Sequence, residues 1–217
     1  MNVLALETSG KILTVALKWD EQYQELTINR GFKHSETLMP AVSSLIQLAG
    51  ISPGDLGLVA CSAGPGSFTG LRIGMATAKG IARGAECSLK AVPTLPLLAA
   101  GREHWPGIVV PVMDARKKRV YAAAFENGRR IRDDADISLD AFLASLPMGS
   151  AVLATGPDAE IASRCDGVII DSQYASGRGL AMIEMAEAAL ESEGPDPADL
   201  GPIYLRLSEA EEALGKG

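Results

Sequence analysis

The clearest fold signal in the chain is LGLVACSAGPGSFTGLRIGMATAKGIA, residues 56–82. Its aliphatic run over residues 56–62 predicts a buried strand, and the glycine-rich residues 63–67 predict a tight turn. Apolar residues then recur at helical spacing, which predicts a helix from about Thr69 to Ala82. Since strand, turn and helix follow one another directly, the segment is a βα unit, and the chain is expected to be α/β.

The residues before this unit predict a small antiparallel sheet and a helix. Two short aliphatic runs, residues 3–6 and 12–17, are separated by a polar turn and predict a hairpin. Residues 23–28 add a third antiparallel strand, and the apolar spacing over residues 34–48 predicts an amphipathic helix.

The second half of the chain begins like the first. Strands are predicted over residues 108–113 and 120–125, on either side of a charged turn. The other expected elements are helices over 92–100, 139–146 and 180–190 and strands over 152–154 and 168–170. Residues 101–107 are the candidate boundary, which divides the chain into residues 1–104 and residues 105–217, with the final segment free to return to the first half.

Composition excludes several classes of protein. The chain has 217 residues, of which 47% are hydrophobic and 22% charged, as in ordinary globular proteins. A net charge of -7 argues against direct binding to a phosphate backbone or an anionic membrane. The three cysteines form no Cys-x-x-Cys pair, and no apolar run reaches membrane-spanning length. We therefore expect a cytoplasmic protein without a metal or a membrane contact.

The glycine-rich turn is a candidate phosphate loop. A turn between a strand and a helix offers free backbone amides to an anion, and the polar turn of the first hairpin is a second source of ligands. The sequence matches neither a Walker loop nor a dinucleotide fingerprint, so glycines that serve a tight turn are the alternative. The candidate residues are Thr8, Ser9, Gly64, Gly66, Ser67 and Thr69.

A second candidate site is the charged turn of the second hairpin. It places four cations, Arg116, Lys117, Lys118 and Arg119, in succession. Such a cluster can contact the phosphates of RNA, or it can simply keep the turn solvated. No aromatic residues alternate with these cations along the sequence, so both interpretations stay open.

Nothing in the sequence forms a recognisable catalytic or metal motif. A histidine pair one helical turn apart would require a ligand at position 38 after His34, and that residue is Leu38. Ser67 lies outside a Gly-x-Ser-x-Gly motif, and no acid-linked histidine can be assigned to it. The glycines of the helix after the glycine-rich turn indicate close packing, either inside the chain or against a partner.

Several motifs together closely resemble the bacterial TsaB (YeaZ) family. The resemblance spans nearly the whole chain and rests on residues 4–9, 34–40, 64–74, 113–116 and 204–206. It implies the actin-like fold, of the ASKHA or ribonuclease-H-like type, with two related α/β subdomains. It also implies a role in forming threonylcarbamoyladenosine beside the anticodon of tRNA.

The resemblance further implies a noncatalytic protein that works through partners and needs no cofactor. In this family TsaB binds the transferase TsaD, the ATPase TsaE joins that complex, tRNA is reached indirectly, and a homodimer forms when TsaD is absent. The chain fits this role because Leu38 replaces the second histidine of the His-x-x-x-His pair that a TsaD-like site needs. The alternatives are an independent actin-like ATPase or kinase that uses the candidate phosphate loop and, less well supported, a peptidase.

The resemblance places the partner interface on the two helices of the first half. The residues mapped to it are His34, Leu38, Val42, Leu45, Gly70, Leu71, Gly74, Met75 and Ala78. An apolar stripe on two adjacent helices could bury the roughly 800 Å² per partner that a specific interface needs.

Overall fold

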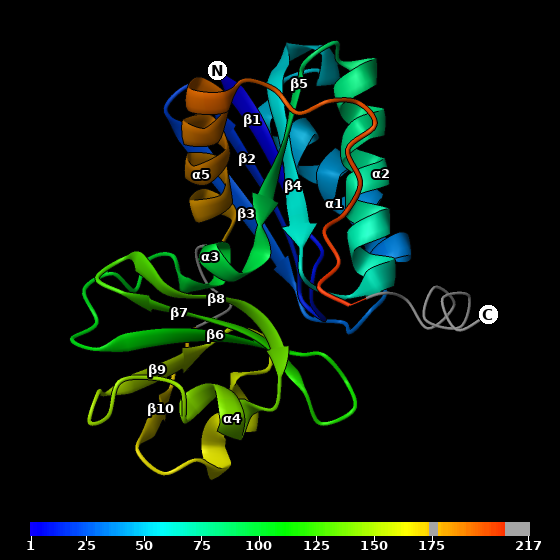
Figure 1. Ribbon diagram of the computed structural model, residues 1–217. Coiled ribbons are helices and arrows are strands. Elements are labelled where there is room, and N and C mark those ends of the chain that lie inside the picture. The colour runs from blue at the N-terminus through cyan, green and yellow to red at the C-terminus, as the bar shows by residue number, and fades with distance from the viewer. Residues whose placement is uncertain (174–177, 207–217) are drawn as a thin grey trace.

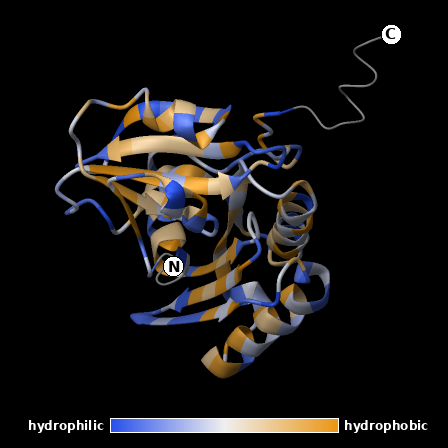
Figure 2. Cartoon of the chain, turned by 90° about the horizontal axis from the view of Figure 1, so that it is seen from below, coloured by the Kyte–Doolittle hydropathy of each residue, from blue (hydrophilic) through white to orange (hydrophobic). Residues whose placement is uncertain are grey.

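The structure is a computed structural model that describes residues 1–173 and 178–206. It consists of two α/β halves, each built on one five-stranded sheet (Figure 1). Apolar and polar residues are interleaved along the strands and around the helices (Figure 2), as expected for elements that each bury one face.

The first sheet, sheet A, has the order β3-β2-β1-β4-β5. Its first three strands pair antiparallel, whereas β4 and β5 run parallel to β1. The strands are β1 (Asn2–Glu7), β2 (Leu13–Trp19), β3 (Gln22–Ile28), β4 (Leu56–Gly64) and β5 (Ser88–Pro93).

The second sheet, sheet B, repeats this arrangement with the order β10-β9-β6-β7-β8. Again three strands pair antiparallel, and the next two run parallel to the first of them. The strands are β6 (Ile108–Asp114), β7 (Val120–Glu126), β8 (Arg129–Ile137), β9 (Val152–Thr155) and β10 (Val168–Ile170). Both halves therefore have one topology, and the predicted actin-like α/β fold with two related subdomains is confirmed.

Helices cover both faces of sheet A. Helix α1 (His34–Ala49) and helix α2 (Phe68–Gly84) lie on one face, and α5 (Arg178–Glu193) lies on the other (Figure 1). The shorter helical segments are η1 (Pro53–Asp55), α3 (Thr94–Ala99), α4 (Leu139–Leu143) and η2 (Ala159–Arg164).

The last long helix belongs to the core of the first sheet, although it follows sheet B in the sequence. Met182 and Ile183 of α5 are fully buried in a cluster with Val3 and Leu58 of sheet A. The chain thus crosses from sheet A to sheet B and returns. A domain boundary at residues 104 and 105 stays a prediction, but the segment after sheet B contributes this helix to sheet A.

The structure differs from the sequence-based expectation at α3, β5 and β8. The helix predicted over residues 92–100 begins only at Thr94, because residues 88–93 form the edge strand β5. The strand was not recognised because Lys90, a charged residue, lies in its middle. Lys90 is nevertheless only 4% exposed, since its charge is paired with Glu193 at 2.8 Å and Asp196 at 3.0 Å. Strand β8 was not predicted, since its charged, mostly exposed sequence lacks the apolar alternation of a half-buried strand.

Candidate functional site

A cleft lies between the two halves, where the turn after β1 and the start of α2 face the turn after β6. Its volume is about 530 Å³, and both polar and aromatic side chains line it. Tyr121 of β7 is among them, and burial followed by the charge of Asp136 raises the pKa of its phenol. The lining residues that were predicted as site residues are Ser9, Gly66, Ser67, Thr69 and Arg116.

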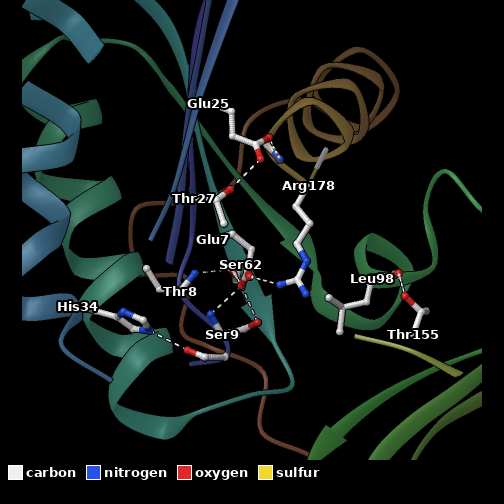
Figure 3. A network of polar contacts seen from close by, with 12 residues as sticks. Glu7, Thr8, Ser9, Glu25, Thr27, His34, Ser62, Leu98, Thr155 and Arg178 are labelled. Atoms are coloured by element: carbon white, nitrogen blue, oxygen red, sulfur yellow. Dashed lines mark hydrogen bonds and ion pairs between the residues drawn. The ribbon is translucent and has the colours of Figure 1, made fainter. Parts of the chain in front are cut away.

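Behind this cleft lies a buried polar network centred on Glu7 (Figure 3). The Ser9 amide and hydroxyl donate to Glu7 Oε1 at 2.7 and 2.5 Å, and the Ser62 hydroxyl donates to the same oxygen at 3.1 Å. Arg178 Nη1 donates to Glu7 Oε2 at 3.1 Å. Glu7 is fully buried and Arg178 is 3% exposed, so the pair is a buried ion pair that fixes α5 to the end of β1.

The sequence did not indicate Arg178 as a partner of Glu7. The two residues lie 171 positions apart, and they meet because α5 returns to sheet A. No local motif around Arg178 indicates this contact, because only the tertiary fold brings its guanidinium to the Glu7 carboxylate.

The helix glycines are explained by packing inside the chain. A Cβ at Gly70 would overlap the Thr8 carbonyl, and a Cβ at Gly74 would overlap the Thr8 hydroxyl. Thr8 itself is fully buried. Gly70 and Gly74 thus let α2 approach the turn after β1, and they are not part of an external surface.

The glycine-rich turn is packed against the turn after β1. The Ser67 amide donates to the Ser9 carbonyl at 2.7 Å, and a Cβ at Gly66 would lie 2.6 Å from that carbonyl. Gly64 has φ +113 and leaves room for the backbone of Ile203. These contacts account for both glycines structurally, and a phosphate at this loop stays a prediction.

Ser67 and His34 have structural contacts of their own. The Ser67 hydroxyl accepts from the Gly70 amide at 3.3 Å and caps α2. His34 Nε2 lies 2.7 Å from the Gly10 carbonyl oxygen and the side chain is 1% exposed, so His34 ties the start of α1 to the first hairpin (Figure 3).

The residues predicted for the partner face are buried inside the chain. Five of the six apolar side chains pack in the core cluster of sheet A, and each of the six is at most 3% exposed. Apolar residues at helical spacing mark the stripe that packs on the sheet, so these side chains are covered by the chain itself. The buried apolar residues of this set are Leu38, Val42, Leu45, Leu71, Met75 and Ala78, and His34, Gly70 and Gly74 are likewise buried. Val42 also lines the groove described next.

The outer flanks of the two helices form a different surface, which we call the α1–α2 groove. The groove has a volume of about 240 Å³ and is mainly apolar. Its lining residues are Met39, Val42, Ser43, Ile46, Gln47, Pro53 and Ile81. Met39 is 48% exposed, and on the outside of α2 a Cβ at Gly80 would meet nothing within 4 Å.

The basic turn is exposed and has an unusual backbone. Arg116, Lys117 and Lys118 have φ values of 64°, 53° and 60°, so three successive non-glycine residues are left-handed. Arg119 pairs with Asp136 at 2.8 Å. Arg116 is the residue of this turn that contributes to the lining of the cleft.

The C-terminal residues 203–206 connect the two halves. The Ile203 amide donates to the Ala63 carbonyl at 2.7 Å, and Arg72 Nε donates to the Tyr204 hydroxyl at 3.0 Å. Arg206 then reaches sheet B, where Nε donates to Asp136 Oδ2 at 2.7 Å. A return of the final segment to the first half was among the sequence-based expectations, whereas the link to sheet B through Arg206 had no signal in the sequence.

Within residues 1–173 and 178–206, no group of three or more His, Cys, Asp or Glu side chains is arranged to hold a metal ion. In the same part of the chain, no helix combines the length and apolar character needed to span a membrane.

Comparison with known proteins gives consistent similarities. Residues 31–163 match the family model of TsaD, tRNA N6-adenosine threonylcarbamoyltransferase. The tRNA threonylcarbamoyladenosine biosynthesis protein TsaB of Bacillus subtilis is 33% identical over 97% of this chain and 96% of its own length. TsaB of Escherichia coli is 36% identical over 59% of this chain and 58% of its own. The solved structure of YeaZ from Pseudomonas aeruginosa superposes with a TM-score of 0.79 at 25% identity, over 94% of this chain and 99% of that one.

Proposed function

Because the chain belongs to the TsaB family of tRNA threonylcarbamoyladenosine biosynthesis proteins, we propose that it serves this pathway as the noncatalytic partner of TsaD. The observation that carries the proposal is the α1–α2 groove. It is an apolar surface on two adjacent helices, and a helix of a partner commonly docks its apolar face into such a groove.

The glycines of α2 support a helix partner. Each interior glycine costs a helix about 1 kcal/mol relative to alanine. At Gly70 and Gly74 the packing of Thr8 offsets this cost, but at Gly80 nothing in the described chain does. A partner helix that lies close to the α2 backbone at Gly80 would explain why a residue without a side chain is found there.

The match to the TsaD family model supports a paired arrangement. Residues 31–163 include α1 and α2, so the transferase family shares these elements with the chain. Two proteins with the same helix pair can join those pairs in a pseudo-twofold dimer, and a second copy of this chain can take the place of TsaD when it is absent.

The buried polar groups support a role without chemistry. Glu7 is held by Ser9, Ser62 and Arg178, His34 binds the Gly10 carbonyl, and the Ser67 hydroxyl caps α2. These are the side chains that an ATPase or a peptidase would have to use. We propose that TsaE joins through the complex with TsaD, that tRNA contacts the basic turn, and that the assembly works in the cytoplasm.

The test is to place a charge in the groove. Met39→Glu should leave the chain folded, because Met39 is 48% exposed, and should abolish co-purification with TsaD and the modified nucleoside. Leu48→Glu is the matched control: Leu48 lies on the same helix, is 66% exposed and does not line the groove. Modification measured by nucleoside mass spectrometry in cells that depend on this chain gives the functional readout.

The outcomes are distinct. Equal loss in both variants, or normal modification by a Met39→Glu protein that no longer binds TsaD, contradicts the proposal. Leu45→Glu is unsuitable for this test, because Leu45 is 1% exposed in the core and a charge there would unfold the chain.

A further inference from the structure

Two aromatic rings line the cleft between the halves and remain accessible. Phe32, just before α1, is 58% exposed, and Phe68, at the start of α2, is 40% exposed. Large apolar side chains usually avoid water, and exposed rings that border a cavity favour a ligand with a flat apolar face.

The two rings differ in how much of their surface is free. Phe68 packs against the Tyr204 ring with centroids 5.2 Å apart, and Arg72 Cζ lies 3.8 Å from the Phe68 centroid. Phe32 has one ring contact, edge-on with His34 at 6.2 Å. The ring of Phe68 is therefore already in contact with Tyr204 and Arg72, whereas Phe32 offers a ring on which a planar group can stack.

A cation faces these rings across the cleft. Arg116 lines the cavity from sheet B, and its guanidinium makes no ion pair or hydrogen bond with the residues that the structure describes. The carboxylates nearby are already engaged. Asp158 accepts from Lys11 Nζ at 3.2 Å and from the Asp114 amide at 2.9 Å, and Asp114 accepts from the Arg116 amide at 2.7 Å.

We propose that this cleft binds one unstacked nucleotide of an RNA strand, with its base against Phe32 and its phosphate at Arg116. The inference rests on the proposed function, which brings tRNA to this chain. A cavity of about 530 Å³ falls in the range of ordinary ligand sites and accommodates one nucleotide. Aromatic stacking and an arginine are the usual means by which proteins hold single-stranded RNA.

Two features of the sequence argue against RNA binding, but neither applies to the cleft itself. The net charge of -7 repels RNA from the chain as a whole, but Arg116 lines the cleft and belongs to a turn with three further cations, Lys117, Lys118 and Arg119. Aromatic residues do not alternate with these cations along the sequence, yet the fold places Phe32 opposite them from the other half.

The test is a titration of the full chain into a single-stranded RNA heptamer that contains one 2-aminopurine. Stacking on Phe32 should quench the 2-aminopurine fluorescence. Phe32→Ala should abolish the quenching and weaken binding about tenfold. Arg116→Gln should reduce the slope of log K against log[salt] by about 0.7, the value for one phosphate contact on a single strand.

Arg129→Gln is the matched control for Arg116→Gln. Arg129 is an exposed arginine at the opposite end of sheet B, where β8 begins, and it does not line the cleft. It should leave affinity and slope unchanged. Circular dichroism checks that each variant is folded, which is expected because Phe32, Arg116 and Arg129 are all exposed.

Three results would overturn the inference. The first is absence of quenching by the native chain, and the second is an equal effect of Arg116→Gln and Arg129→Gln. The third is displacement of the heptamer by free AMP at an equal concentration, which would assign the cleft to a free nucleotide. Because none of these measurements involves TsaD, a failure here leaves the proposed pairing untouched, and a loss of pairing leaves this test valid.

Discussion

Two glycines of α2 should respond in opposite ways to the same substitution. Alanine is favoured over glycine in a helix interior by about 0.8–1 kcal/mol. At Gly80 a new Cβ meets nothing within 4 Å, so Gly80→Ala should keep this full gain and raise the Tm by about 2–4 °C. At Gly74 the new Cβ would overlap the Thr8 hydroxyl and lie 3.1 Å from Thr8 Cβ.

The size of the difference follows from this packing. Because Thr8 is fully buried, Gly74→Ala should incur an overpacking cost of about 1–3 kcal/mol. The helix-propensity gain is common to both variants and cancels, which leaves Gly80→Ala more stable than Gly74→Ala by that amount. Urea unfolding followed by far-UV circular dichroism measures both free energies of unfolding, provided that the m-values agree. A Gly74→Ala protein as stable as Gly80→Ala would refute the packing argument.

The same pair of variants also separates stability from docking. If a partner helix lies close to the α2 backbone at Gly80, Gly80→Ala should weaken co-purification with TsaD although it stabilises the isolated chain. Undiminished binding by this stabilised variant would place the partner helix away from Gly80.

Two further predictions concern buried groups of sheet A. Arg178→Met leaves the Glu7 carboxylate buried and without its cation, which should lower the free energy of unfolding by about 3–5 kcal/mol; a loss below about 1 kcal/mol in urea unfolding would contradict the role of this ion pair. Burial, then the charge of Asp196, raises the pKa of the Cys61 thiol to about 12, so the folded chain keeps a proton that the unfolded thiol loses above about pH 8.5. The free energy of unfolding should therefore be unaffected by this thiol below about pH 8.5 and should fall as the pH rises from there to about 12. In Cys61→Ala the slope of the free energy of unfolding against pH should be smaller in this range, by the amount expected for one proton. Equal slopes for the two proteins would disprove this prediction.

Local patterns in the sequence predicted most of the secondary structure. The strand, turn and helix over residues 56–82 correspond to β4 and α2, and the two hairpins that begin the halves correspond to β1–β2 and β6–β7. These elements were predictable because their apolar residues follow the period of a strand or a helix. The edge strand β8 was not predictable in this way, since the charges along it leave no apolar period.

Sequence periodicity also identified the apolar stripes of α1 and α2 but not what covers them. Leu38 and Leu45 contact the chain's own sheet, and Met39 faces outward beside them. A helical period specifies that one side is buried, and it contains no information on whether the sheet or a partner buries it. The period alone therefore could not locate a docking surface, and the one proposed above rests on the α1–α2 groove of the tertiary structure.

The sequence by itself determined the α/β class, the duplicated halves and the family, because these depend on local periodicity and contiguous motifs. Only the tertiary structure decided that Glu7 meets Arg178, that Gly74 makes room for Thr8, and that Phe32 faces Arg116 across a cleft. Each of these pairs joins residues that are far apart in the chain. Their contact depends on how the two sheets and the returning helix α5 pack, which no local pattern encodes.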